Sequence, residues 1–74
     1  MAYEIGNEEK INMVNQHIKN LSYAKYDLEL SKIEALAVHT VEEVAAMAYQ
    51  DQIDDTTSKI LKLEEILDTL IPTV

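Results

Sequence analysis

The feature that most constrains this chain is the stretch of 65 residues from position 7 to 71, which contains neither glycine nor proline. The single glycine, Gly6, and the single proline, Pro72, flank it. A β-rich chain needs repeated turns, and these usually carry Gly, Pro or Asn-Gly. The stretch is instead rich in Ala, Leu, Glu, Lys and Ile, of which most are good helix formers. The sequence therefore predicts an all-α fold.

The chain is short for an independent fold. Its 74 residues make one small helical domain, 1–74, in which residues 1–6 are expected to form a short N-terminal arm. A domain of this size buries only about 60% of its unfolded surface, so it commonly depends on disulfides, a metal or a partner chain. The sequence has no cysteine, which excludes disulfides and thiolate metal sites. We therefore expect a homo-oligomer, most simply a dimer.

Apolar residues recur at alternating spacings of three and four, which is the pattern of a helix face buried against another helix. We call each such row a seam. The first seam skips Lys25 and comprises Ile11, Val14, Ile18, Leu21 and Leu28. The second seam comprises Tyr23, Tyr26, Leu30, Ile33, Ala37, Thr40, Val44 and Met47. The third seam comprises Ile53, Thr56, Ile60, Leu63, Leu67 and Leu70.

The first two seams overlap over residues 21–30, where they lie on nearly opposite flanks of one helix. They are displaced by two residues, or about 200° around the helix axis. A helix with two apolar flanks needs two neighbours, and in so short a chain one of them is expected to come from another copy. The predicted interface residues are Tyr23, Tyr26, Leu30, Ile33, Val44 and Met47. The alternative is a single wide apolar face, with the tyrosine hydroxyls exposed to water.

Capping signals locate the helix ends. Asn7, followed by two glutamates, predicts the first helix start. Thr40 and Glu43 match the S/T-x-x-E capping box, which predicts a second helix start. The chain would then form an antiparallel hairpin of helices at about 7–37 and 41–71, which would dimerise into a four-helix bundle.

A second possible turn lies in the acidic segment DQIDDTTS, residues 51–58, because Asp and Thr favour helix caps over helix interiors. A turn there would give one long helix, 7–51, with a short helix, 57–71, folding back on it. Both turns together are a third possibility. Within the same region, Ala45, Ala46 and Ala48 permit close approach of another helix, either in the core or in a groove for a partner helix.

The charge distribution argues against several partner classes. The net charge is −8 without any arginine, divided as −2 over residues 1–39 and −6 over residues 40–74. Nucleic-acid-binding surfaces are basic, and an anionic membrane would repel this chain. No apolar run approaches the roughly 18 residues of a membrane span, and the N-terminal residues do not resemble a signal peptide. We expect a cytoplasmic protein that binds neither nucleic acid nor membrane directly.

Two pairs of acidic residues form the strongest pattern for an enzyme: Asp51 with Asp54, and Glu65 with Asp68. Such pairs can hold Mg²⁺ between helices. The pattern resembles the E-x-x-E, gap, E-x-x-D motif of all-α nucleotide pyrophosphohydrolases, a resemblance that implies Mg²⁺-dependent phosphate chemistry. It departs from that motif in its first pair, which is aspartate, and in its gap of ten residues.

Other chemistry has less support in the sequence. His39 and Glu42, with Glu43 beside them, reverse the E-x-x-H order of helical carboxylate metal sites and offer too few ligands. Neither His17 nor His39 has an evident serine partner, and no glycine-rich phosphate loop is present. We therefore expect a non-enzymatic protein without a cofactor, which acts by self-association and by binding another protein. The alternatives are an acidic decoy of a nucleic-acid-binding protein and the Mg²⁺-dependent phosphohydrolase.

Overall fold

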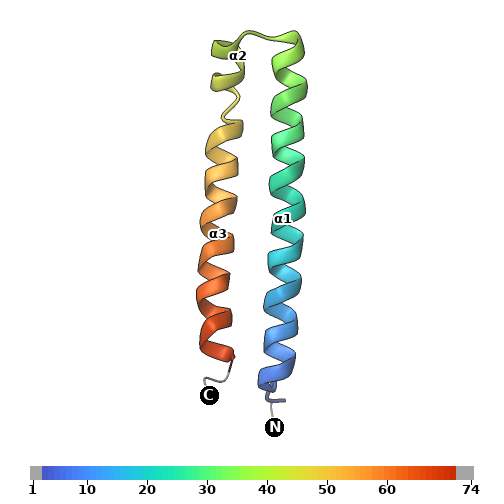
Figure 1. Ribbon diagram of the computed structural model, residues 1–74, viewed down its shortest axis with the longest axis vertical. Helices are drawn as coiled ribbons and strands as arrows, with labels where there is room; N and C mark the ends of the chain where they lie inside the picture. Colours follow the sequence, from blue (N-terminus) through green and yellow to red (C-terminus); the bar gives the residue numbers. More distant parts are fainter. Residues whose placement is uncertain (1–2, 72–74) are drawn as a thin grey trace.

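The computed structural model describes residues 3–71, and the helices in this part of the chain form an antiparallel hairpin (Figure 1). The long helix α1 (Asn7–Val38) is followed by the short helix α2 (Val41–Ala46) and by α3 (Tyr49–Leu70). Helices α2 and α3 run back along α1, so that the start of α1 and the end of α3 lie at the same end of the hairpin (Figure 1). The all-α prediction is confirmed.

The turn lies at His39 and Thr40, where the capping box predicted it. Thr40 Oγ1 accepts a hydrogen bond from the Glu43 amide at 3.2 Å, and Glu43 Oε1 accepts one from the Thr40 amide at 2.9 Å. Both residues preceding α2 have extended backbone, which reverses the chain without a glycine. The alternative of one long helix over 7–51 is therefore wrong, because α1 ends at Val38.

The first helix starts at the predicted position but with a different cap. Gly6 is the N-cap, and Asn7 is already the first helical residue, so its side chain does not cap the helix. Asn7 Nδ2 instead donates to the Leu70 carbonyl at 3.5 Å and joins the two ends of the hairpin. In the arm, Tyr3 Oη donates to Glu9 Oε1 at 2.7 Å, and this bond raises the pKa of Tyr3.

The first and third seams face each other along the hairpin. Every member of both seams is buried or half-buried, and the first seam continues inward through Lys25, Lys32 and Ala35. The buried residues of the described chain are few: Ala35, Val44, Ile53 and Thr56. Thr56 satisfies its hydroxyl within α3 by donating to the Gln52 carbonyl at 2.8 Å, so a polar residue can occupy the seam.

The prediction of one continuous helix over 41–71 is wrong, because the helix is broken at Met47 and Ala48. Extending the spacing of the third seam backwards from Ile53 would turn Ala46 inward. Val44 would then point about 200° away from that direction, into water. The break reorients α2 so that Val44 is only 2% exposed. Burial of this valine favours the interruption.

The break is made by an alanine in a conformation that glycine usually adopts. Ala48 has φ 58° and ψ 28°, in the left-handed region, and is the N-cap of α3. A non-glycine residue there is strained by roughly 1–2 kcal/mol. The cost is local, whereas the reorientation that it permits buries Val44, the one buried residue of α2.

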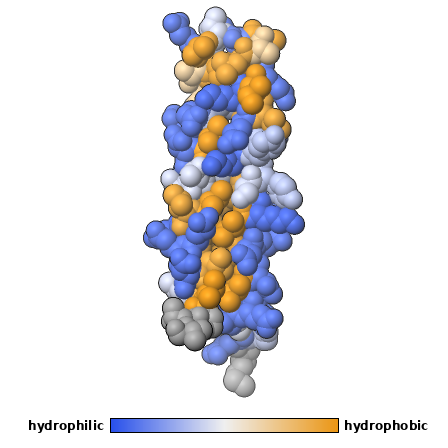
Figure 2. Space-filling view, in the orientation of Figure 1, coloured by the Kyte–Doolittle hydropathy of each residue, from blue (hydrophilic) through white to orange (hydrophobic). Residues whose placement is uncertain are grey.

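The hairpin is a single layer of helices. Its dimensions are 55 × 28 × 16 Å, and the smallest of these is little more than the roughly 10–12 Å diameter of one helix. Figure 2 shows apolar side chains reaching the surface along the line between the two long helices, and again at the end that carries α2. Domains usually contain at least two packed layers, so at least one flat face lacks the cover that a second layer gives.

Candidate interaction surface

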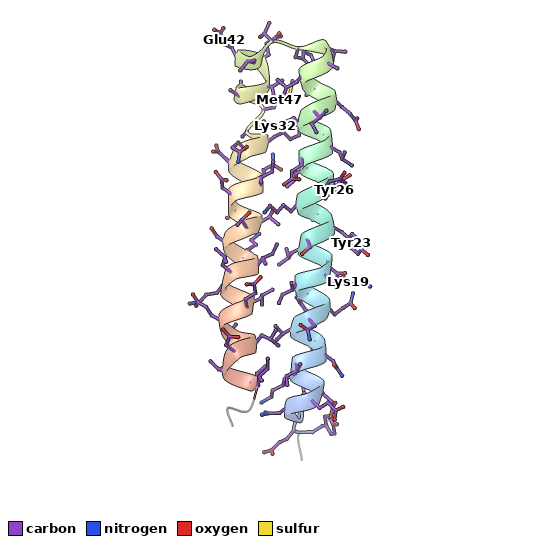
Figure 3. The ribbon with its side chains drawn as sticks, in the orientation of Figure 1. Lys19, Tyr23, Tyr26, Lys32, Glu42 and Met47 are labelled. Atoms are coloured by element: carbon purple, nitrogen blue, oxygen red, sulfur yellow. The ribbon has the colours of Figure 1, made fainter. Side chains whose placement is uncertain are left out.

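The outer flank of α1 carries an exposed apolar row, which we call the outer stripe. It comprises Tyr23, Tyr26, Leu30 and Ile33, whose exposed fractions are 66%, 60%, 39% and 64%. Figure 3 shows that Tyr23 and Tyr26 project from α1 away from α3. Lys19 Nζ lies 5.9 Å from the centre of the Tyr23 ring, within cation–π range. These four members of the second seam therefore all remain exposed in the described part of the chain.

The other two predicted interface residues lie elsewhere. Val44 belongs to the core of the hairpin itself, since it is 2% exposed. Met47 is 38% exposed and lines a shallow hollow with Val38 and His39. The second seam is therefore divided, because the turn at His39 separates its α1 members from its α2 members.

A second apolar feature lies beside the turn, and we call it the hinge groove. It is a hollow of about 420 Å³ lined chiefly by Lys32, Leu36, Val41, Val44, Ala45 and Ala48. Another hollow of about 420 Å³ shares Lys32 and Leu36 with it and extends it along α1 past Ile33. Sequence reasoning identified the alanines, but it did not find Leu36 or Val41, which belong to no seam.

One hydrogen bond crosses the hinge groove from α1 to α3. Lys32 Nζ donates to Gln50 Oε1 at 2.8 Å, and Figure 3 shows the Lys32 side chain between the two helices. The ammonium group is held by this bond, while its aliphatic chain lines the groove. Leu36 is 42% exposed and Val41 is 74% exposed, so the groove is open to a large ligand.

The two acidic pairs proposed for Mg²⁺ lie on the same helix, α3, and are not brought together. Asp51 and Glu65 are fourteen residues apart, or about 21 Å along the helix axis. Asp54 accepts a hydrogen bond from Gln50, and Glu65 pairs with Lys62 at 3.3 Å. Among residues 3–71, no group of three His, Asp or Glu side chains is placed to hold a metal ion.

His39 is part of the turn and lies beside the capping box. Its Nδ1 is 3.8 Å from Glu43 Oε2. The hydrogen bond from the Thr40 amide lowers the pKa of Glu43, the bond to the Thr40 hydroxyl lowers it further, and His39 contributes in the same direction. His17 is exposed on α1. Within residues 3–71, neither histidine belongs to a group of three side chains that could hold a metal ion.

Comparison with protein-family models, with curated proteins and with solved structures finds no match to this chain. None of the helices in the described part of the chain has the length and apolar character needed to cross a membrane. The two apolar surfaces, the outer stripe and the hinge groove, are therefore the candidate functional sites.

Proposed function

We propose that this chain is a non-enzymatic interaction module that acts by self-association, most simply as a dimer in which two hairpins form a four-helix bundle. The observation that carries this proposal is the outer stripe. Its two tyrosines project away from α3, and its leucine and isoleucine are exposed on the same helix. Aromatic side chains of this kind are enriched at protein interfaces.

The surface area of the chain supports the same proposal. A compact monomer of 8.4 kDa is expected to expose about 4600 Å², whereas this hairpin exposes 5917 Å². The excess, about 1300 Å², is larger than the roughly 800 Å² that each partner contributes to a standard interface. Covering the stripe with a second hairpin would also supply the second helical layer that the chain lacks.

The test is the mass of the protein in solution at several concentrations, measured by sedimentation equilibrium. We expect twice the chain mass of 8.4 kDa for the wild-type protein. Tyr26→Lys should shift the equilibrium to monomer, because it places a cation in the centre of the stripe. Leu61→Lys is the matched control, since Leu61 lies on α3 and is 55% exposed, compared with 60% for Tyr26.

The outcomes separate the proposal from its rivals. A wild-type protein that stays monomeric at all concentrations would refute self-association. A dimer that Leu61→Lys disrupts as strongly as Tyr26→Lys would refute the outer stripe as its interface. Circular dichroism of each variant should show unchanged helix content, because both substituted positions are exposed to solvent.

A further inference from the structure

The hinge groove is a second apolar surface, distinct from the outer stripe. Its floor is formed by Val44, Ala45 and Ala48, and its walls by Leu36, Val41 and the aliphatic chain of Lys32. Neither Leu36 nor Val41 contributes to the α1–α3 seams, and both remain substantially exposed. The groove exists because α2 is reoriented at Ala48, which places three small or apolar residues of the second half of the chain opposite Leu36.

The shape of the groove suits a helix. The two hollows of about 420 Å³ share Lys32, Leu36 and Gln50, so they lie next to each other along α1, with the Lys32–Gln50 hydrogen bond among the residues that they share. An amphipathic helix binds an apolar groove by inserting apolar side chains one turn apart. Small residues in the floor, here Ala45 and Ala48, allow the backbone of a second helix to approach closely.

The charge around the groove defines the chemistry of that helix. From Ile33 to Ser58 the sequence contains no lysine or arginine. Its acids include Glu42 on α2 and Asp51, Asp54 and Asp55 at the start of α3, whereas Glu34 lines the separate hollow with His39 and Met47 and Glu43 is held in the capping box. Asp51 lines the groove, and Glu29 lines its extension. The one cation in the groove, Lys32, is engaged by Gln50. A helix with apolar residues on one face and cationic residues beside them would match both the floor and the surroundings.

We propose that the hinge groove is a docking site for a cationic amphipathic helix of another protein. The apolar face of that helix occupies the groove between Leu36 and Val41, and its lysines or arginines lie against the acidic surface of α2 and the start of α3. The hollow between Leu36 and Val41 contains no residue of the outer stripe, so a hairpin paired through the stripe can still bind such a helix there, whereas the extension of the groove shares Ile33 with the stripe.

The experiment uses the full chain and a fluorescein-labelled peptide of Leu and Lys, about 14 residues or roughly four turns long, with its leucines on one helix face. A second peptide has the same composition in a scrambled order. Fluorescence anisotropy is measured at low and at high salt. We expect the amphipathic peptide to bind at least about tenfold more tightly than the scrambled one, and this ratio to persist at high salt, where charge attraction is screened.

Two matched variants separate groove binding from charge attraction. Val41→Glu and Val38→Glu each add one negative charge, at positions that are 74% and 77% exposed. Only Val41 lines the groove, whereas Val38 lines the hollow with His39 and Met47. We expect Val41→Glu to weaken binding of the amphipathic peptide about tenfold and Val38→Glu to leave it unchanged or slightly tighter. A carboxylate at Val41, the first residue of α2, is also favourable for the helix.

Three results would overturn the proposal. Equal binding of the two peptides would show charge attraction alone, as would binding to Val41→Glu that matches Val38→Glu. If the wild-type protein is a dimer and the Val41→Glu variant is a monomer, the groove is occupied by a second copy of this chain. Leu36→Gln, which removes an apolar wall without adding charge, provides a second variant and should also weaken binding. Failure of these tests leaves the outer stripe untouched, since none of the substituted residues belongs to it.

Discussion

The two flanks of α1 carry apolar side chains at similar spacings, but α3 covers only one of them. The inner flank meets the third seam and includes the buried Ala35, whereas the outer stripe retains exposed fractions of 39% to 66%. The difference lies in the charge and size of the residues as much as in their position. The inner flank tolerates Lys25 and Lys32, while the outer stripe carries two tyrosines, which keep a hydroxyl in water and offer an apolar ring to a partner.

A seam in the sequence identifies an apolar surface but not the molecule that covers it. In a chain of two long helices, each helix has one intramolecular neighbour. A second seam on α1 therefore has no partner within the hairpin, and its burial requires a different chain. If the two flanks differ in this way, substitutions on the inner flank should lower the free energy of unfolding far more than substitutions in the outer stripe.

The largest expected effect contrasts two isoleucines. Ile53 is 7% exposed in the inner seam, and Ile33 is 64% exposed in the outer stripe. Ile53→Ala should lower the free energy of unfolding by about 3 kcal/mol, since it removes buried methyl groups and leaves a cavity. Ile33→Ala should change it by less than about 0.5 kcal/mol in dilute protein. Urea denaturation at low protein concentration measures both, and similar losses would contradict the assignment of inner and outer flanks.

The next effect concerns concentration. If the outer stripe pairs two hairpins, unfolding is coupled to dissociation, and a tenfold rise in protein concentration stabilises the dimer by about 1.4 kcal/mol. The thermal midpoint should then rise by roughly 3–5 °C per tenfold change. Tyr26→Lys should abolish this dependence while Leu61→Lys preserves it. A wild-type thermal midpoint that does not change with protein concentration would show that the outer stripe does not pair two hairpins and remains exposed to solvent.

Local signals predicted much of this fold, because they act between residues close in sequence. The capping box of Thr40 and Glu43 needs only four residues, and it located the turn correctly. The first and third seams are likewise local patterns, and both proved to face inward. Local spacing does not determine which residues of α2 face the core of the hairpin, because that depends on where α1 lies after the turn. For this reason the break at Ala48 was not predicted.

The candidate surfaces were predictable to different degrees for the same reason. The outer stripe lies on one helix and follows one spacing, so it could be recognised in the sequence as a row of apolar residues. The hinge groove gathers residues of α1, α2 and the start of α3, and only the reoriented α2 brings Val41 and Leu36 to one hollow. No spacing in the sequence connects these two residues. The two acidic pairs show that a regular spacing does not by itself make a site, because both pairs lie on α3 and are not brought together.

The break that completes the inner flank can be tested at Ala48. Ala48→Gly should stabilise the protein by about 0.5 to 1 kcal/mol, because glycine adopts φ 58° without strain, although it also gains freedom in the unfolded chain. Ala45→Gly, inside α2, is the control and should destabilise by a similar amount. Thermal unfolding of the two variants should move the midpoint in opposite directions. Destabilisation by both would contradict the left-handed conformation of Ala48.

The smallest expected effect comes from the turn that determines which flank of α1 meets α3. The Thr40 hydrogen bonds lower the pKa of Glu43 in the folded state. A group with a lowered folded pKa contributes stability above its unfolded pKa and loses that contribution as the pH falls through the folded value. Glu43→Gln keeps an acceptor but removes the charge. The wild-type protein should therefore be more stable than Glu43→Gln at neutral pH, and the difference should shrink as the solution is acidified through the carboxyl range.

His39 must be removed from this measurement, because its Nδ1 lies 3.8 Å from Glu43 Oε2 and this contact would contribute to the effect of the substitution. Both proteins should therefore carry His39→Gln, and their unfolding is followed in urea at neutral, mildly acidic and strongly acidic pH. A difference that grows on acidification would mean that the protonated form of Glu43 is the one the turn stabilises, and the capping box would then not hold a carboxylate. A difference that shrinks ties the direction of the turn, and hence the choice of the inner flank, to the ionised Glu43.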